Sequence, residues 1–76
     1  MIYNRIPILR AEAGLTRHVL ADKLGINYQT VGFIERSDYM PSLELAFKIA
    51  EVFDVELSVV FSDEPFEPIF VKKGKK

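Results

Sequence analysis

The fold of this chain is decided by residues 16–36, which read TRHVLADKLGINYQTVGFIER. Thr16 can cap a helix in which the apolar residues Leu20 and Leu24 recur at helical spacing. Gly25 ends that helix, because glycine adopts a left-handed conformation at the lowest cost. The stretch therefore predicts a short helix, a tight bend at glycine, and a second short helix held at a steep angle to the first.

The second of these helices, around Tyr28 to Arg36, is predicted to project from the domain. Asn27 can accept a hydrogen bond from its free amides, while Val31 and Ile34 point inward. The other side chains are left free to face outward. A B-form major groove is about 12 Å wide, which is close to the diameter of one helix with its side chains. The predicted geometry therefore suits the reading of base edges in DNA.

Three further helices are predicted around this pair. Asn4 can cap a short first helix. Ser42 can cap the clearest helix of the chain, whose apolar stripe continues to Phe53. Residues 56–61 predict a short fifth helix, although their alternating pattern is also compatible with a strand. We therefore expect an all-α fold, a five-helix domain over residues 1–62.

Residues 63–76 are predicted to form a C-terminal extension with an extended or β segment, because Pro65 and Pro68 interrupt any continuous helix. Its apolar side chains are too many for a solvated end, so they should cover a surface. They can fold back on their own subunit, or form a strand that pairs with a second chain. We favour the second arrangement, since one short helix reads few bases. The dimer interface is then predicted at Phe66, Ile69, Phe70 and Val71.

The composition is typical of a small protein with a packed core. The chain has 76 residues, of which 49% are hydrophobic, and it has no cysteine, which excludes disulfides and fits a reducing cytosol. No segment matches a signal peptide or a membrane span, so we expect a cytoplasmic protein without a membrane partner. The net charge of −1 argues against DNA binding if the whole chain is considered. The arginines, however, all lie in the first half, so one face can be basic.

Several separate motifs agree on one family. They are Leu-Thr at 15–16, Leu-Ala-x-x-Leu-Gly at 20–25, Gln-Thr-Val at 29–31, Ile-Glu at 34–35 and Pro-Ser-Leu at 41–43. With these motifs, the region from about Arg5 to Phe61 resembles the helix-turn-helix family of the phage repressor and Cro type, also called the xenobiotic-response-element family. The resemblance implies a repressor-like fold with a DNA-binding helix-turn-helix. It also implies double-stranded DNA as the partner.

The resemblance assigns the reading of bases to the second helix of the pair. Gln29 is the strongest candidate, because an amide side chain can donate and accept together on an adenine edge. Phe33 can contact a thymine methyl group, whereas Gly32 leaves one reading position without a side chain. The predicted base-reading residues are Asn27, Tyr28, Gln29 and Phe33.

The resemblance also implies contacts to the DNA backbone, which place the helix while base contacts choose the sequence. Arg17 stands at the start of a helix, where the free amides also favour phosphate. The predicted phosphate-contacting residues are Arg17, Thr30, Arg36, Tyr39, Met40 and Ser42. In the same family an arginine of the first helix pairs with a glutamate at the end of the third. This implies a structural ion pair between Arg10 and Glu35.

The sequence predicts no catalytic residues, no metal site, no cofactor and no small-molecule ligand. His18 is the single histidine, and no nucleophile or phosphate-binding loop accompanies the acidic residues near the C-terminus. The favoured interpretation is a transcriptional regulator that binds an inverted-repeat operator as a homodimer, with repression implied by the resemblance. The alternative is an antitoxin-like protein-interaction module in which DNA binding is secondary or lost.

Overall fold

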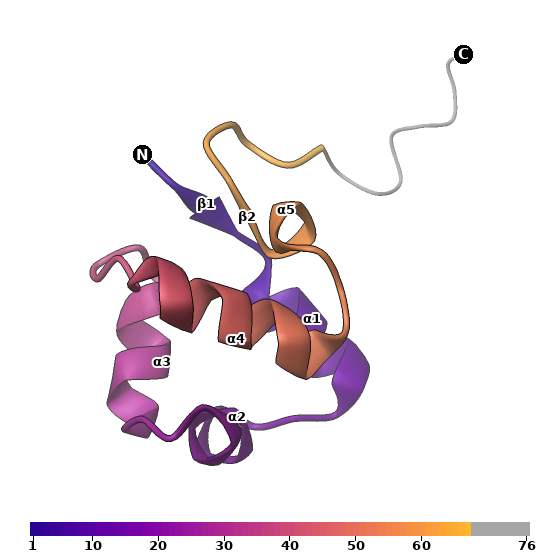
Figure 1. The fold of residues 1–76 in the computed structure, drawn as a ribbon. Coiled ribbons are helices and arrows are strands. Elements are labelled where there is room, and N and C mark those ends of the chain that lie inside the picture. The colour runs from indigo at the N-terminus through magenta and orange to yellow at the C-terminus, as the bar shows by residue number, and fades with distance from the viewer. Residues whose placement is uncertain (68–76) are drawn as a thin grey trace.

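The structure is a computed structural model that describes residues 1–67. Ile69, Phe70 and Val71 of the predicted dimer interface lie outside the described residues. The described part confirms an all-α, five-helix fold with a short β segment towards its C-terminal end. Its elements, drawn in Figure 1, are β1 (Tyr3–Asn4), α1 (Ile6–Ala13), α2 (Arg17–Leu24), α3 (Tyr28–Glu35), α4 (Leu43–Phe53), α5 (Leu57–Val60) and β2 (Phe61–Ser62).

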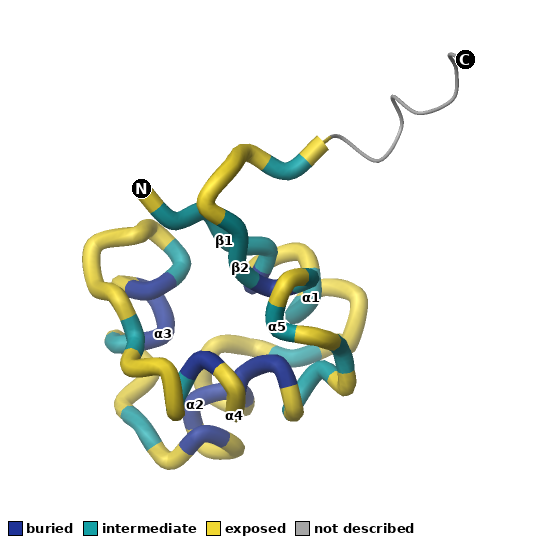
Figure 2. Tube along the Cα trace, turned by 45° about the horizontal axis from the view of Figure 1, so that its top comes forward, coloured by how far each residue is buried: buried dark blue, intermediate teal, exposed yellow. Residues whose placement is uncertain are grey.

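One apolar core lies between the helices, and each helix contributes at least one buried residue to it (Figure 2). The stripes at helical spacing in α2, α3 and α4 supply most of this core, as their sequence patterns predict. No helix within residues 1–67 is long and apolar enough to cross a membrane. The buried members of the core are Ile6, Leu20, Ala21, Leu24, Val31, Ile34, Ile49, Ala50 and Val60.

The starts of α2, α3 and α4 are fixed by side-chain caps, as their sequences predict. The Thr16 hydroxyl accepts from the Val19 amide at 3.1 Å. Asn27 Oδ1 accepts from the Gln29 amide at 2.7 Å. The Ser42 hydroxyl accepts from an amide of the first turn of α4 at 3.1 Å. Each cap satisfies an amide that has no partner inside the helix.

The N-terminus differs from its prediction, because Arg5 and not Asn4 is the capping residue of α1. Asn4 belongs to β1, which pairs antiparallel with β2 in a two-stranded sheet that the sequence did not predict. The Asn4 side chain accepts from the amide of Ile6 at 3.0 Å. Its Nδ2 donates to the main-chain oxygens of Ile34 and Glu35 at 3.2 and 3.1 Å. Asn4 therefore fastens the N-terminal strand to the end of α3.

The bend between α2 and α3 depends on Gly25, whose φ is 72° and ψ is 31°. We expect Gly25→Ala to lower the free energy of unfolding by about 1–2 kcal/mol, since this left-handed conformation strains a residue with a Cβ atom. Denaturant unfolding followed by circular dichroism measures the change. Gly25→Asn is the control and should lose less, because asparagine tolerates this conformation better. Equal stability of the alanine variant and the wild type would contradict the prediction.

Candidate nucleic-acid interface

Helix α3 lies at the edge of the domain, with one face in the core and the other turned outward (Figures 1 and 2). Val31 and Ile34 are buried against the core. Gln29 is exposed, and Tyr28 and Phe33 keep 43% and 45% of their surface accessible. Three of the four predicted base-reading side chains therefore stand on an open surface. The fourth, Asn27, is exposed too, but its Oδ1 is engaged in capping α3.

Tyr28 is held by a residue that the sequence did not single out for this role. The ring of His18, on α2, stacks on the Tyr28 ring with 4.0 Å between centroids and 26° between planes. The stack joins the exposed faces of α2 and α3 at the start of the reading helix. It restricts the positions available to the Tyr28 hydroxyl, which reduces the entropy lost when that hydroxyl contacts a ligand.

A shallow pocket of about 260 Å³ lies on the outer face of this helix pair. It brings together two of the predicted phosphate-contacting residues and three of the predicted base-reading residues. Gly32 forms its floor and is buried although it lies on the outward side. The lining residues are Arg17, Tyr28, Gln29, Gly32, Phe33 and Arg36.

Glu35 links three helices through two arginines, one of which, Arg17, also lines this pocket. Its side chain is only 2% exposed, and its Oε2 accepts from Arg10 Nε at 2.6 Å. Arg10 also donates to the main-chain oxygen of Leu15 at 3.2 Å. Arg17 Nε donates to Glu35 Oε1 at 2.9 Å, so a second arginine joins the pair implied by the family resemblance. No spacing rule gives this third member, because it depends on how α2 packs against α3.

Arg36 follows α3 and lies beside both Phe33 and the next loop. Its Nε donates to Asp38 Oδ2 at 3.2 Å. Its guanidinium carbon stands 5.2 Å from the centre of the Phe33 ring, within the range of a cation–π contact. These two contacts hold the Arg36 guanidinium at the edge of the pocket.

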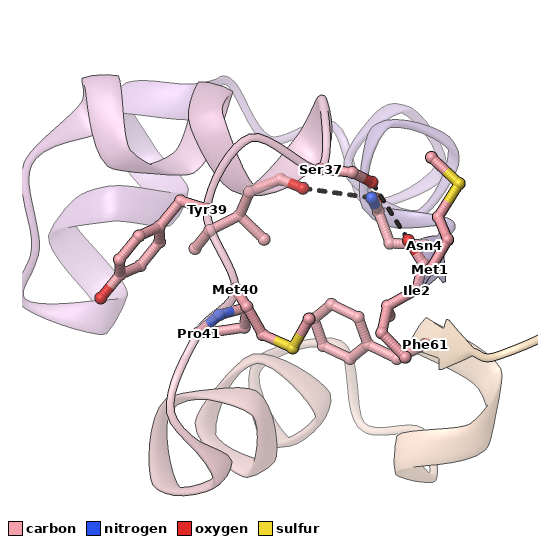
Figure 3. Close-up of a pocket in the computed structure, with 9 residues that line it drawn as sticks. Met1, Ile2, Asn4, Ser37, Tyr39, Met40, Pro41 and Phe61 are labelled. Carbon is pink, nitrogen blue, oxygen red and sulfur yellow. Dashed lines mark hydrogen bonds between the residues drawn. The ribbon is translucent and has the colours of Figure 1, made fainter.

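The other predicted phosphate-contacting residues lie away from this pocket. Thr30 is partly buried in α3, and the Ser42 hydroxyl caps α4. Tyr39 and Met40 instead line a second, apolar pocket of about 130 Å³ between β1, the end of α3 and β2. In Figure 3 the Met40 side chain points toward Phe61, whereas the Tyr39 ring turns away from the group. The structure thus does not bring these side chains together with Arg17 and Arg36.

Phe66 is the one residue of the predicted dimer interface that the structure describes. It is partly buried, and the Arg5 guanidinium lies over its ring at 4.2 Å from the centre. Phe66 is therefore in contact with its own chain near the start of α1.

Comparison with known proteins gives consistent relatives. The helix-turn-helix family model matches residues 8–60. A Methanocaldococcus jannaschii protein, the uncharacterised HTH-type transcriptional regulator MJ0272, is 45% identical over 64 residues, covering 84% of this chain and 97% of the relative. An uncharacterised HTH-type transcriptional regulator of Archaeoglobus fulgidus is 44% identical over 63 residues, covering 80% and 90%. The Bacillus subtilis regulator YgzD, also uncharacterised, is 41% identical over 58 residues, covering 76% and 88%.

A solved structure agrees with these sequences. A Bacteroides fragilis protein proposed to bind DNA superposes with a TM-score of 0.74 at 29% identity, covering 82% of this chain and all of that one. The match confirms the helical architecture that carries the exposed face of α3. Because the family model matches most of the chain, the chain belongs to the helix-turn-helix family of DNA-binding transcriptional regulators, of the phage repressor and Cro type.

Proposed function

We propose that this chain represses transcription by binding an inverted-repeat operator as a homodimer, with α3 of each copy in a major groove. The observation that carries the proposal is the outer face of α3. Gln29 is exposed there between two aromatic residues, and two arginines stand at its edges. Arginines that stand beside a row of neutral readers can engage the DNA backbone next to the bases being read.

The side chains have distinct roles in this proposal. Gln29 forms a paired hydrogen bond with an adenine edge, and Phe33 contacts a thymine methyl group. Tyr28 donates from its hydroxyl, and Asn27 donates from the Nδ2 that capping leaves free. Arg17, Thr30, Arg36, Tyr39, Met40 and Ser42 contact the backbone, Met40 through its main chain.

The charge distribution supports binding to DNA despite the net charge of −1. Around α3, three arginines pair with only two carboxylates, which leaves one positive charge in excess beside the reading helix. Acidic residues gather instead after residue 50, in the C-terminal part of the sequence. A local positive charge attracts phosphate whatever the total for the chain, because salt screens charges beyond about 10 Å.

A homodimer supplies the selectivity that one reading helix lacks. Helix α3 has eight residues, so it reaches only a few base pairs. Two copies related by a two-fold axis place their reading helices about 34 Å apart, on successive major grooves of one face of the duplex. The C-terminal extension, residues 63–76, forms the interface in this proposal. It directly follows β2 in the chain.

Selection from a random pool of double-stranded DNA tests the proposal. The wild-type protein is expected to enrich a two-fold symmetric sequence, and sedimentation of the complex is expected to give two chains per duplex. An operator inserted over a promoter should lower transcription in a purified system when the protein is added.

Three results would count against it. Failure to enrich any sequence at low salt would remove DNA binding as the function. Such a failure, together with a stable complex with another protein, would favour the antitoxin-like interaction module. One chain per duplex on an asymmetric sequence would remove the homodimer.

A further inference from the structure

Two arginine side chains lie over Gly32, Arg17 from the first turn of α2 and Arg36 from the residue that directly follows α3. A Cβ atom built at Gly32 would lie 3.2 Å from Arg36 Nη1 and 3.6 Å from Arg17 Nη1. The first of these distances is tighter than ordinary van der Waals contact. Both guanidinium groups therefore approach the same point of the helix surface, and a side chain at position 32 would have to displace Arg36.

Both arginines are fixed at one end and free at the other. Arg17 donates from Nε to Glu35, and Arg36 donates from Nε to Asp38. Within residues 1–67, these Nε bonds are the hydrogen bonds that the structure gives the two side chains, so their terminal nitrogens keep their donors. The side chains are 44% and 52% exposed, so a ligand can reach those donors from solvent.

Two like charges directed at one point favour an anion between them. A guanidinium fork binds a phosphate through two parallel hydrogen bonds, with its geometry already set. The terminal nitrogens here surround a shallow pocket that also contains Gln29. Arg10, Arg17 and Arg36 carry three positive charges, and their ion-pair partners Glu35 and Asp38 carry two negative charges. One phosphate diester neutralises the remaining positive charge.

We propose that Arg17 and Arg36 together bind one backbone phosphate of the operator, and that Gly32 is the residue that makes this two-arginine site possible. The inference rests on the DNA binding proposed above and adds a fixed point to it. The phosphate lies directly over the backbone of α3, so it sets how deeply this helix enters the groove. A branched side chain at position 32 would extend beyond its Cβ atom toward the two guanidinium groups, so it would displace Arg36 at least.

Single-phosphate substitution tests this site. Each phosphate of the selected operator is replaced in turn by an uncharged methylphosphonate, and the affinity of the wild type is measured. We expect one position in each half-site to weaken binding by roughly tenfold or more, as for the loss of charge-assisted hydrogen bonds. Gly32→Val and Arg36→Ala should each bind the unmodified operator roughly tenfold less tightly, and both should be less sensitive than the wild type to methylphosphonate at that position.

The variants separate this inference from a loss of folding. Gly32→Val is expected to unfold at a temperature close to that of the wild type, because the better helix propensity of valine offsets the displacement of the exposed Arg36 side chain. If it fails to fold, Arg36→Ala gives the same comparison without a change in α3 packing. Ser58→Ala, an exposed substitution on α5, is the matched control and should keep the wild-type substitution map.

Two results overturn the inference while the proposed function stands. In the first, the wild type binds its operator, and the Gly32→Val variant shows the same loss of affinity as the wild type at every substituted phosphate. The other is a loss that follows replacement of a guanine by 7-deazaguanine instead of a phosphate, which would make the two arginines base readers. A wild type that selects no DNA would instead remove the proposed function itself.

Discussion

Replacing Glu35 by alanine is expected to lower the free energy of unfolding by about 3–5 kcal/mol, because it leaves a buried charge without its partner. The Glu35 carboxylate accepts from Arg10 and from Arg17, and Arg10 is only 19% exposed. Arg17, which is 44% exposed, can turn to solvent when the carboxylate is lost, whereas Arg10 stays largely buried. Small domains have total free energies of unfolding of roughly 5–15 kcal/mol, so this loss should leave the Glu35→Ala variant only marginally stable. Chemical denaturation at 25 °C measures the loss.

Controls assign this loss to the buried charge. Glu51→Ala removes a carboxylate from an exposed position of α4 and should change stability by about 0.5 kcal/mol or less. The double variant Arg10→Met, Glu35→Leu removes both charges and should recover much of the stability, since apolar residues can replace a buried ion pair. A loss below about 1 kcal/mol in Glu35→Ala would show that the ion pair has little structural effect.

Replacing Gln29 by alanine is expected to produce the largest change in DNA binding. A paired hydrogen bond to a base contributes about 1–3 kcal/mol of discrimination, and the proposed homodimer makes it twice. The expected loss is therefore about 2–6 kcal/mol for the complex, or roughly thirtyfold to more than ten-thousandfold in affinity. Titration of the selected operator at fixed salt measures this change.

The change at Gln29 should be specific to one base. Gln29→Ala should lose its preference at a single base pair of each half-site and keep the others, whereas Ser58→Ala should keep all of them. Because Gln29 is exposed, the melting temperature should stay close to that of the wild type. Unchanged affinity and preference in the variant would show that Gln29 does not read bases.

The local elements of the fold were predictable from the sequence because their signals are local. A hydroxyl or amide cap is recognised by the residue itself, which is why Thr16, Asn27 and Ser42 all occupy the predicted positions. Glycine at a helix end is recognised in the same way, and Gly25 is left-handed as expected. The alternating segment near residue 57 folded as a short helix, with a strand directly after it.

The long-range pairings were not predictable in this way. The antiparallel pairing of β1 with β2 joins residues near the two ends of the chain, and each strand has only two residues, too few for a sequence pattern. The stack of His18 on Tyr28 and the bond from Arg17 to Glu35 depend on the angle between two helices. Gly32 shows the same limit. The glycine in the sequence indicates that this reading position has no side chain, but only the packed structure shows which neighbouring side chains cover it.

The side chain of Asn4 joins the chain terminus to the reading helix. It stands in β1, opposite Phe61 of β2, and it also donates to the last carbonyl groups of α3. The Ser37 hydroxyl adds a second link by donating to the main-chain oxygen of Ile2 at 3.1 Å (Figure 3). Separating the two strands would therefore also remove hydrogen bonds from the last turn of α3, so the orientation of this helix depends on a strand pairing at the opposite end of the sequence.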